Sequence, residues 1–435
     1  MNISFLGAAR EVGRSAILVE GKENILLDCG IKLTKNEEFP LLDNRTVRTL
    51  DKVVLSHAHL DHCGYLPALY ASGYKKKVAM TKPTRDLIQL LLADYLRLNK
   101  EGVIPYNQAD VDTLLKSTDI LEYNEPTKGT TPIRFSEAGH IIGSAITEVF
   151  AEKKIIYTGD LNLRTSRLLE GAQTGLEGEV LVIESTYGAK ADSHTASKDV
   201  GKQLIDSINS SLKKGGKVII PTFAIGRGQE ILFTLESYMR SGGLHSCPIF
   251  LDGMVNKALR IYRHNAIYLK KEVQRRILTS DDDPFKSDFY HVPEKKDKSD
   301  VLESGECIIL CTSGMLNGGP VLTYLKALGG NRKNKMILVG YQAEGSRGRA
   351  LIDGAKEIDI GGEPVEINLE VDQARFTAHS DHRDLVKFAK GIKGLKQALI
   401  VHGEPHKQDE LAEAIEEHCK GVQAYAPQPG EAVVI

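Results

Sequence analysis

The sequence predicts an α/β protein with a second α/β domain inserted into the first. Strand-like segments separated by turns begin the chain, at residues 3–6, 16–19, 24–27 and 52–55. Farther along, strand-like segments lead into glycine-containing turns, twice followed by a helical pattern, within 218–240, 307–325 and 336–349. This succession indicates parallel βαβ units and therefore a doubly wound parallel sheet. We expect the first domain at 1–186 and 371–435, and the inserted domain at 187–370.

The remaining elements follow from the hydrophobic pattern. Apolar residues recur at helical spacing in 84–99, and a second helix is expected at 107–117. Strands are expected at 133–135, 145–150 and 154–158, each ending close to a residue that could bind metal. A strand at 398–401 and a helix at 407–419 complete the first domain. The polar segment 270–300 is expected to be an exposed excursion.

Composition favours an intracellular enzyme. The chain has 435 residues, 41% of them hydrophobic, which is enough for two or three domains. No apolar stretch approaches the length of a membrane span, and Met1-Asn2-Ile3-Ser4 begins no signal peptide, so we expect a cytoplasmic protein without membrane contact. The six scattered cysteines predict free buried thiols. A net charge of −2 argues against binding of nucleic acid by bulk charge. A polyanionic partner would have to be held by a local basic surface.

The most informative segment is His57-Ala-His59-Leu-Asp61-His62, which follows the apolar run 53–55. A short loop leaving a buried strand can direct His57 and His59 to one side and Asp61 and His62 to the other. Neighbouring residues can thus serve two ions about 3.5–4 Å apart. Imidazole nitrogen and carboxylate oxygen suit zinc best, with manganese or iron as alternatives. An exposed polar turn would have no physical need for three histidines.

Three further candidate ligands, His140, Asp160 and His402, lie far apart in the sequence. Each follows apolar strand-like residues and adjoins a glycine. A lone histidine is more often a hydrogen-bonded polar residue than a ligand. Two ions that share a bridging hydroxide, however, need about seven protein ligands. The first loop supplies only four, so the three distant residues become candidates for the rest.

These residues together resemble a known family. Asp28, the HxHxDH loop, His140, Asp160 and His402 look like the five motifs of the metallo-β-lactamase fold, and the intervening domain resembles the β-CASP insertion. The resemblance covers nearly the whole chain. The chain resembles archaeal relatives of the cleavage and polyadenylation specificity factor nuclease that lack KH domains. It resembles ribonuclease J more loosely. It implies an αββα sandwich with an inserted β-CASP domain. Further matching segments are 7–15, 184–188, 221–227, 313–316, 340–345 and 376–381.

The resemblance also implies roles for individual residues. It places His57, His59 and His140 on one zinc ion, Asp61, His62 and His402 on a second, and Asp160 between the two, with manganese as an alternative metal. Asp28 would orient a ligand by hydrogen bonding. A hydroxide activated between the ions would attack a phosphodiester, leaving a 5′-phosphate and a 3′-hydroxyl. The catalytic residues would be Asp61, His379, which protonates the leaving 3′-oxygen, and Glu184, which holds His379.

The substrate expectation depends on His402. His402 resembles the last motif of the β-CASP proteins, which has histidine in RNA-acting members and valine in DNA-acting members. The resemblance therefore implies single-stranded RNA as the substrate. Small-molecule hydrolases of the superfamily lack the insertion and the Glu184/His379 pair, and a flavodiiron-type oxidoreductase would need a carboxylate in place of His59. An inactive subunit of a processing complex would have lost ligands, and all are present here. We expect 5′-to-3′ exonuclease activity with some endonuclease activity; the alternative is purely internal cleavage in mRNA 3′-end processing.

Residues that could hold RNA are inferred from their position beside the motifs: Arg227, Arg347, Arg349, Ser380, His382 and Lys407. With no appended RNA-binding module expected at either end, the cleft itself would have to hold the RNA. The family resemblance further implies a homodimer and other RNA-processing factors as partners.

Overall fold

The computed structural model describes residues 1–33, 37–99, 104–280, 282–340, 342 and 345–435. The chain folds into two compact units. The first unit comprises Met1–Thr165, Leu169–Ser193 and His379–Ile435, and the second comprises Ser166–Leu168 and His194–Ala378. The α/β class and the insertion are therefore confirmed. The domain limits expected at residues 186 and 370 stay a prediction.

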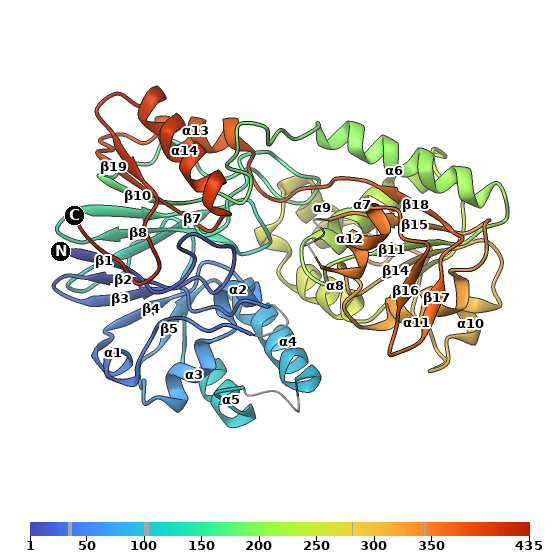
Figure 1. Ribbon diagram of the computed structural model, residues 1–435, viewed down its shortest axis with the longest axis horizontal. Helices are drawn as coiled ribbons and strands as arrows, with labels where there is room; N and C mark the ends of the chain where they lie inside the picture. The colour runs from blue at the N-terminus through green and yellow to red at the C-terminus, as the bar shows by residue number, and fades with distance from the viewer. Residues whose placement is uncertain (34–36, 100–103, 281, 341, 343–344) are drawn as a thin grey trace. The chain divides into compact units, whose positions relative to one another are not determined.

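The first unit contains two sheets. One has seven strands, in the order β21 (Ala432–Val434), β1 (Asn2–Phe5), β2 (Ile17–Glu20), β3 (Asn24–Leu27), β4 (Lys52–Val54), β5 (Val78–Met80), β6 (Thr118–Ile120). The other has six, in the order β20 (Gln423–Tyr425), β19 (Gln397–Val401), β10 (Val180–Glu184), β9 (Lys154–Tyr157), β8 (Ala145–Phe150), β7 (Ile133–Glu137). The two chain ends lie side by side because β1 and β21 pair antiparallel (Figure 1).

Helices cover the outer faces of these two sheets (Figure 1). The seven-stranded sheet is covered by helices from the first third of the chain, α1 (Asn44–Thr49), α3 (Leu66–Ala71), α4 (Lys82–Leu98) and α5 (Gln108–Lys116). The six-stranded sheet is covered by α13 (His382–Lys390) and α14 (Pro405–His418). The order helix, sheet, sheet, helix is the αββα sandwich expected from the sequence. The helices predicted at 84–99, 107–117 and 407–419 are α4, α5 and α14.

The core of the first unit lies between the sheets. Ile3 and Phe5 of β1 pack with Phe135 of β7, Val182 of β10 and Leu399 of β19, all fully buried. A second cluster fills the space between the six-stranded sheet and its helices, where Leu385 and Leu411 belong to α13 and α14. Strands with both faces covered read as continuous apolar runs, which explains the sequence pattern at β10 and β19. All six cysteines are buried and none forms a disulfide.

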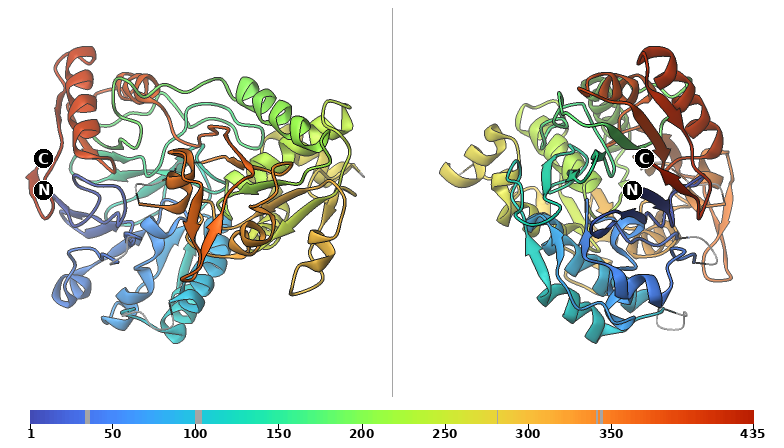
Figure 2. Two further views of the ribbon diagram at one scale, coloured as in Figure 1. Left: turned by 45° about the vertical axis from the view of Figure 1, so that its right-hand side comes forward. Right: turned by 90° about the vertical axis from the view of Figure 1, so that its left-hand side faces the viewer.

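The second unit is built on a six-stranded parallel sheet, with the order β13 (Tyr290–His291), β12 (Ile249–Asp252), β14 (Ile308–Cys311), β11 (Val218–Pro221), β15 (Lys335–Leu338), β18 (Glu370–Gln373). Helices α6 (Ser197–Leu212) and α7 (Arg227–Arg240) contact each other on one face. On the other face lie α11 (Pro320–Leu328), α12 (Arg347–Ile352) and the hairpin of β16 (Glu357–Asp359) and β17 (Pro364–Glu366), drawn in orange in Figures 1 and 2. Their apolar side chains belong to one buried cluster. The doubly wound parallel sheet is confirmed.

The segment 270–300, expected to be an exposed excursion, has mostly exposed or half-buried side chains among its described residues and also contains regular structure. It contains α9 (Lys271–Thr279), β13 and α10 (Ser299–Leu302). Val273 and Phe285 are buried in it, and the surrounding charges hide these two apolar anchors in the sequence pattern. Among the described residues, no helix combines the length and the apolar composition that crossing a bilayer requires.

The polar motifs lie at one end of the first unit because of strand direction. Strands β3 and β4 run parallel, so Asp28 and His57, which follow them, emerge at the same edge. Strands β9, β10 and β19 are also mutually parallel, and they bring Asp160, Glu184 and His402 to their carboxyl ends. This is the edge at which ligand sites of such sheets form.

Candidate metal centre

The HxHxDH loop is interlocked with the end of β3. The amide of Cys29 donates to His62 O (2.8 Å), and Ser15 N donates to Asp61 O (2.8 Å). Gly30 lies so close to the loop that a Cβ there would stand 1.8 Å from Asp61 O. Only glycine permits this approach. The loop then enters the short helix α2 (Leu60–Cys63), for which His59 is the N-cap.

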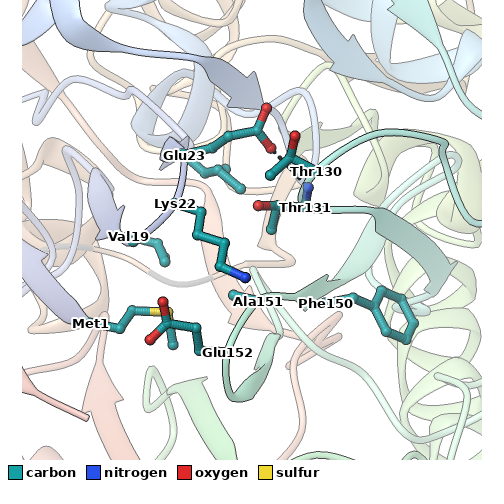
Figure 3. A pocket seen from close by; sticks show the side chains of 11 residues that line it. Met1, Val19, Lys22, Glu23, Thr130, Thr131, Phe150, Ala151 and Glu152 are labelled. Carbon is teal, nitrogen blue, oxygen red and sulfur yellow. Dashed lines mark hydrogen bonds between the residues drawn. The ribbon is translucent and has the colours of Figure 1, made fainter.

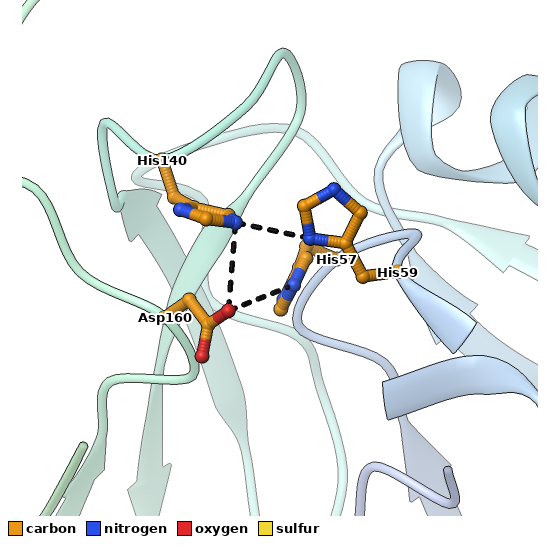
Figure 4. A group of neighbouring side chains, drawn as sticks. All are labelled: His57, His59, His140 and Asp160. Atoms are coloured by element: carbon orange, nitrogen blue, oxygen red, sulfur yellow. Dashed lines mark hydrogen bonds and ion pairs between the residues drawn. The ribbon is translucent and has the colours of Figure 1, made fainter. Parts of the chain in front are cut away.

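The first cluster of candidate ligands combines His57 and His59 of this loop with His140 and Asp160 (Figure 4). One ligand atom from each lies within 4.8 Å of all the others. Asp160 Oδ2 is 3.4 Å from His57 Nε2 and 3.4 Å from His140 Nε2. His140 Nε2 in turn is 3.1 Å from His59 Nδ1. Three imidazoles and a carboxylate thus converge on one point.

The second cluster is formed by Asp61, His62 and His402. Here the other oxygen of Asp160 faces inward: Oδ1 is 3.2 Å from His62 Nε2 and 3.4 Å from His402 Nδ1. His402 Nε2 lies 3.4 Å from Asp61 Oδ2. The two oxygens of Asp160 therefore divide between the two clusters, which is the arrangement a bridging carboxylate requires.

The donor set fits divalent metal. Among the described residues, four buried ligand atoms have no hydrogen-bond partner: Nε2 of His57, His62 and His402, and Oδ1 of Asp160. They approach neighbouring nitrogens or oxygens at 3.2–3.4 Å without hydrogen-bond geometry. A buried polar atom without a partner is costly, so several in one place indicate an external partner. Nitrogen and carboxylate donors suit zinc or another transition metal.

Protonation in this cluster also favours a cation. Burial lowers the pKa of His57 and His140, and lowers that of His59 to about 3, so these rings are neutral and can donate lone pairs at pH 7. Burial opposes ionisation of Asp160, but the surrounding histidines hold its pKa well below the usual range. His62 is the exception, because the carboxylates of Asp160 and Asp61 overcome burial and raise its pKa.

Asp28 orients His62 from behind. Its Oδ2 accepts hydrogen bonds from His62 Nδ1 (2.7 Å), Ser56 Oγ (2.7 Å) and Tyr157 Oη (2.7 Å), and its Oδ1 accepts from Ser56 N (2.7 Å). His62 Nδ1 is thereby the donor, which leaves Nε2 directed at the cluster. Asp28 and His402 both have left-handed backbones (φ 60° and 52°), a conformation uncommon for non-glycine residues and frequent at functional sites.

Asp28→Asn is expected to weaken metal binding by about 10–100-fold, the usual effect of losing the group that holds a ligand. An asparagine side chain of the same size has one accepting oxygen, so it cannot replace both carboxylate oxygens that accept from His62 and Ser56. Metal affinity measured by competition with a chromogenic chelator checks this. Asp51→Asn, at the opposite end of β4, is the control and should bind metal like the wild type. Equal affinity in the Asp28 variant would contradict the orienting role.

His379 and Glu184 lie beside the cluster as a pair. His379 Nδ1 is 2.9 Å from Glu184 Oε1 and 3.2 Å from Oε2, and its Nε2 is 4.0 Å from Asp160 Oδ2. Glu184 is buried and also accepts from Leu161 N (2.7 Å). The carboxylate therefore fixes the ring with Nε2 toward the metal ligands and provides the counter-charge for its protonated form. All seven expected ligands, with Asp28, Glu184 and His379, are brought together in the first unit.

The segment that carries His379 is fastened to the segment after Asp160. Ser380 N donates to Leu161 O (2.7 Å), and Leu163 N donates to Ser380 Oγ (3.0 Å). Arg164 binds Asp381 and also Asp384, with Nε 2.6 Å from Asp384 Oδ2. Ser380 is fully buried. Its hydroxyl holds the backbone that follows Asp160. Contact of Ser380 with RNA stays a prediction.

His382 and Lys407 brace the loop that follows Glu184. His382 Nδ1 donates to Gly188 O (2.7 Å), and Lys407 Nζ donates to Thr186 O (3.1 Å). The Lys407 ammonium also lies 5.6 Å from the centre of the Tyr187 ring. Both side chains are thus partly committed to holding this loop. Contact with RNA stays a prediction for both.

The three arginine candidates belong to the second unit. Arg227 begins α7, and Arg349 forms an ion pair with Asp353 one turn along α12 (2.9 Å). Arg347 donates from Nε to Asp359 O (2.6 Å) and from Nη1 to Leu316 O (3.2 Å). RNA contact stays a prediction for all three. Within the motif 340–345 noted in the sequence, residues 341, 343 and 344 lie outside the described residues.

Sequence reasoning missed several residues that hold the site. Ser56 and Tyr157 both bond to Asp28, and Ser144 Oγ accepts from His140 N (3.1 Å). Arg164 was missed as well. Tyr157 and Ser144 each lie three or four residues from a candidate ligand, so proximity to the motifs was the available signal. Their partners are distant in sequence, which no local pattern reveals.

A hollow of about 100 Å³ lies elsewhere on the first unit (Figure 3). It is lined by residues that include Met1, Lys22, Glu23, Thr131 and Glu152. Residues 21–23 precede β3, so the hollow is at the amino end of the strand whose carboxyl end leads to Asp28. None of the candidate site residues lines it, and we assign it no role in the chemistry.

Comparison with known proteins agrees with this geometry. The Metallo-beta-lactamase superfamily model matches residues 9–207, the Beta-Casp domain model 228–351, and the Zn-dependent metallo-hydrolase RNA specificity domain model 364–427. The transcription termination factor FttA of Methanocaldococcus jannaschii is 39% identical, over 100% of this chain and 71% of the relative. FttA of Cenarchaeum symbiosum is 35% identical, over 100% and 70%. The RNase J-like protein of Methanocaldococcus jannaschii is 40% identical, over 98% of each chain.

Histidine and aspartate clusters that share a carboxylate, at the carboxyl ends of strands in an αββα sandwich, define a metal-dependent hydrolase. The matches identify which kind. The chain belongs to the β-CASP family of the metallo-β-lactamase superfamily, as its motifs indicated, and is a metal-dependent ribonuclease of that family.

Proposed function

We propose that the protein is a zinc-dependent ribonuclease that hydrolyses single-stranded RNA to 5′-phosphate and 3′-hydroxyl ends. The observation that carries this proposal is the position of Asp160, whose two oxygens face different ligand clusters while His379 Nε2 lies 4.0 Å from one of them. Two zinc ions per chain, or manganese in their place, fit the two clusters. A hydrolytic site and a proton donor thus lie side by side.

Bound divalent ions supply Lewis-acid polarisation of the phosphodiester and an activated water nucleophile. His57, His59 and His140 would hold one ion, Asp61, His62 and His402 the other, and Asp160 both. His379 protonates the 3′-oxygen as it leaves, and Glu184 keeps the ring in place for that transfer. Asp61 would thus act in metal binding, and Glu184 and His379 in proton transfer.

RNA is favoured over DNA by His402, because the family resemblance associates histidine at this position with RNA-acting members. The names of the relatives agree, since one is an RNase J-like protein, and the matched domain at 364–427 is described as an RNA specificity domain. A DNA-acting nuclease is the weaker alternative. A non-catalytic RNA-binding subunit is also weaker, because all the expected ligands converge in the first unit.

The cleavage mode is proposed to be 5′-to-3′ exonucleolytic with some internal cutting. The second candidate is purely internal cleavage of transcripts, in 3′-end processing or termination, and it is supported by the relatives named transcription termination factor. The FttA protein and the RNase J-like protein of Methanocaldococcus jannaschii are 39% and 40% identical to this chain, so sequence identity does not favour one cleavage mode over the other. A homodimer, other RNA-processing factors as partners and a cytoplasmic location are retained as proposals from the family resemblance.

One set of substrates tests this proposal. Protein loaded with zinc or manganese is given single-stranded RNAs of one sequence that carry a 5′-monophosphate, 5′-triphosphate or 5′-hydroxyl, with the matching DNA as control. We expect RNA cleavage with mononucleotide release that favours the monophosphate. Internal fragments alone would select the second candidate. Equal cleavage of DNA would overturn the inference from His402, and no cleavage by metal-loaded protein would overturn the nuclease proposal.

A further inference from the structure

One surface of the second unit carries a concentration of positive charge. It is formed by α8 (Val255–His264), the single turn η1 (Ala266–Tyr268) and α9; α8 and α9 are labelled in Figure 1, and the segment is coloured yellow. Residues 255–280 include seven lysines and arginines and a single acidic residue, Glu272. The whole chain has a net charge of −2, so this concentration is local.

Helix α8 is amphipathic. It buries Val255, Ala258, Leu259 and Tyr262 against the unit. Its exposed side presents Lys257, Arg260 and His264. Positions three and four apart on a helix lie on one face, about 5–6 Å from each other. The three basic side chains therefore form a row along the solvent side of α8.

Helix α9 carries two further exposed cations and packs against the turn before it. Lys271 and Arg275 are exposed and one helical turn apart. Gln274 Nε2 donates to Leu269 O (2.6 Å) and Ile267 O (2.9 Å), which fastens α9 to η1. Two large apolar side chains are exposed among the charges, Ile267 at 66% and Leu278 at 58%. The surface is therefore basic with isolated apolar contacts.

Other arginines of the same region are neutralised by carboxylates. Arg263 pairs with Asp283, and Arg276 pairs with Asp282 (3.0 Å) and Glu236 (3.0 Å). In contrast, Lys257, Arg260, Lys271 and Arg275 form no ion pair with any residue that the structure describes. The paired acidic side chains thus compensate the partly buried cations. Beside the exposed cations of residues 255–280 stands one acidic residue, Glu272, and among the described residues it forms no ion pair. An ordinary solvated helix face more often intersperses both signs.

We propose that this basic row, Lys257, Arg260, His264, Lys271 and Arg275, binds the phosphate backbone of single-stranded RNA outside the metal centre. The inference rests on the proposed ribonuclease function and adds a second RNA-binding surface to it. Exposed, uncompensated cations on a helical scaffold suit sequence-independent phosphate contact. An acidic protein partner would need a larger apolar centre than two separated side chains provide.

Binding is measured with the full chain carrying His379→Ala, so that RNA remains intact, in zinc or manganese. The ligand is a fluorescent single-stranded RNA of about 30 nucleotides at several salt concentrations. The test variant is Lys257→Ala/Arg260→Ala/Lys271→Ala/Arg275→Ala. The control removes the same charge from scattered exposed lysines of the same unit that have no ion pair among described residues: Lys202→Ala/Lys286→Ala/Lys333→Ala/Lys356→Ala.

We expect the test variant to lose roughly 10-fold or more in affinity at 0.1 M salt, and the slope of log K against log salt to flatten by about 3, or 0.7 for each of four lost phosphate contacts. The control should change neither value by a comparable amount. In the chain with intact His379, the KM for the long RNA should rise while kcat and cleavage of a five-nucleotide RNA are preserved.

Affinity and slope equal to those of the control would overturn the proposal. So would a variant that keeps RNA affinity but loses binding to a polyglutamate peptide, or one that only changes the oligomeric state, since the row would then serve an acidic protein or a second copy. The ribonuclease proposal fails separately: wild-type protein would then bind RNA in this salt-dependent manner without cleaving it.

Discussion

Asp160→Asn is expected to abolish RNA cleavage, lowering kcat by at least about 10³-fold. Asp160 is buried, and its two oxygens face different ligand clusters at 3.2–3.4 Å. An amide of the same size offers one oxygen and no negative charge, so it cannot serve both clusters. Metal ions stabilise the charge of the transition state by several kcal/mol, and each 1.36 kcal/mol of that stabilisation is a factor of ten in rate.

Two quantities are measured on the same protein: the single-turnover rate of RNA cleavage, and the metal content by elemental analysis. Less than the wild-type amount of metal should remain in Asp160→Asn after dialysis. The control Asp51→Asn removes a carboxylate from the other end of β4 and should retain both metal and rate. Full metal content with a rate near that of the wild type would mean that Asp160 does not bridge the clusters.

His379→Ala is expected to lower kcat by about 10²–10⁴-fold, the usual contribution of a general acid, with metal content unchanged. The ring contacts Glu184 and faces the cluster, but it is not a member of either ligand group. Glu184→Gln should have a smaller effect in the same direction, because the amide keeps the volume but removes the counter-charge of the ring.

A substrate with sulfur in place of the leaving 3′-oxygen distinguishes an acid from a merely structural residue. A thiolate leaves without a proton, so the deficit of His379→Ala should shrink at least about tenfold on this RNA if the ring delivers one. Asp160→Asn should gain no such recovery. An equal deficit of His379→Ala on both RNAs would remove the residue from the chemistry.

The candidate metal ligands could be picked out because each is marked locally. The HxHxDH loop follows a buried strand, and His140, Asp160 and His402 each follow an apolar strand and adjoin glycine. Parallel strands with aligned carboxyl ends then bring such residues together, whatever their separation in sequence. The structure supplied what spacing cannot: the division of the Asp160 oxygens between two clusters.

The residues that position the ligands were less predictable. Ser56, Tyr157 and Arg164 are ordinary polar residues in sequence, and their importance comes from partners such as Asp28 and Asp381 that only the fold brings near. Proximity to a motif also does not reveal what a residue packs against. Ser380 adjoins His379, and only the fold shows that it is fully buried and joins two backbone segments.

The arrangement of the candidate ligands and His379 suits a hydrolysis in which water attacks phosphorus and the 3′-oxygen leaves. The most direct test is cleavage in water enriched in the heavy oxygen isotope, followed by mass analysis of the products. We predict incorporation of one heavy oxygen into the 5′-phosphate, a plain 3′-hydroxyl end, and cleavage at a bond whose upstream nucleotide lacks its 2′-hydroxyl. Products with a 5′-hydroxyl and a 2′,3′-cyclic phosphate, or dependence on the 2′-hydroxyl as nucleophile, would contradict the account.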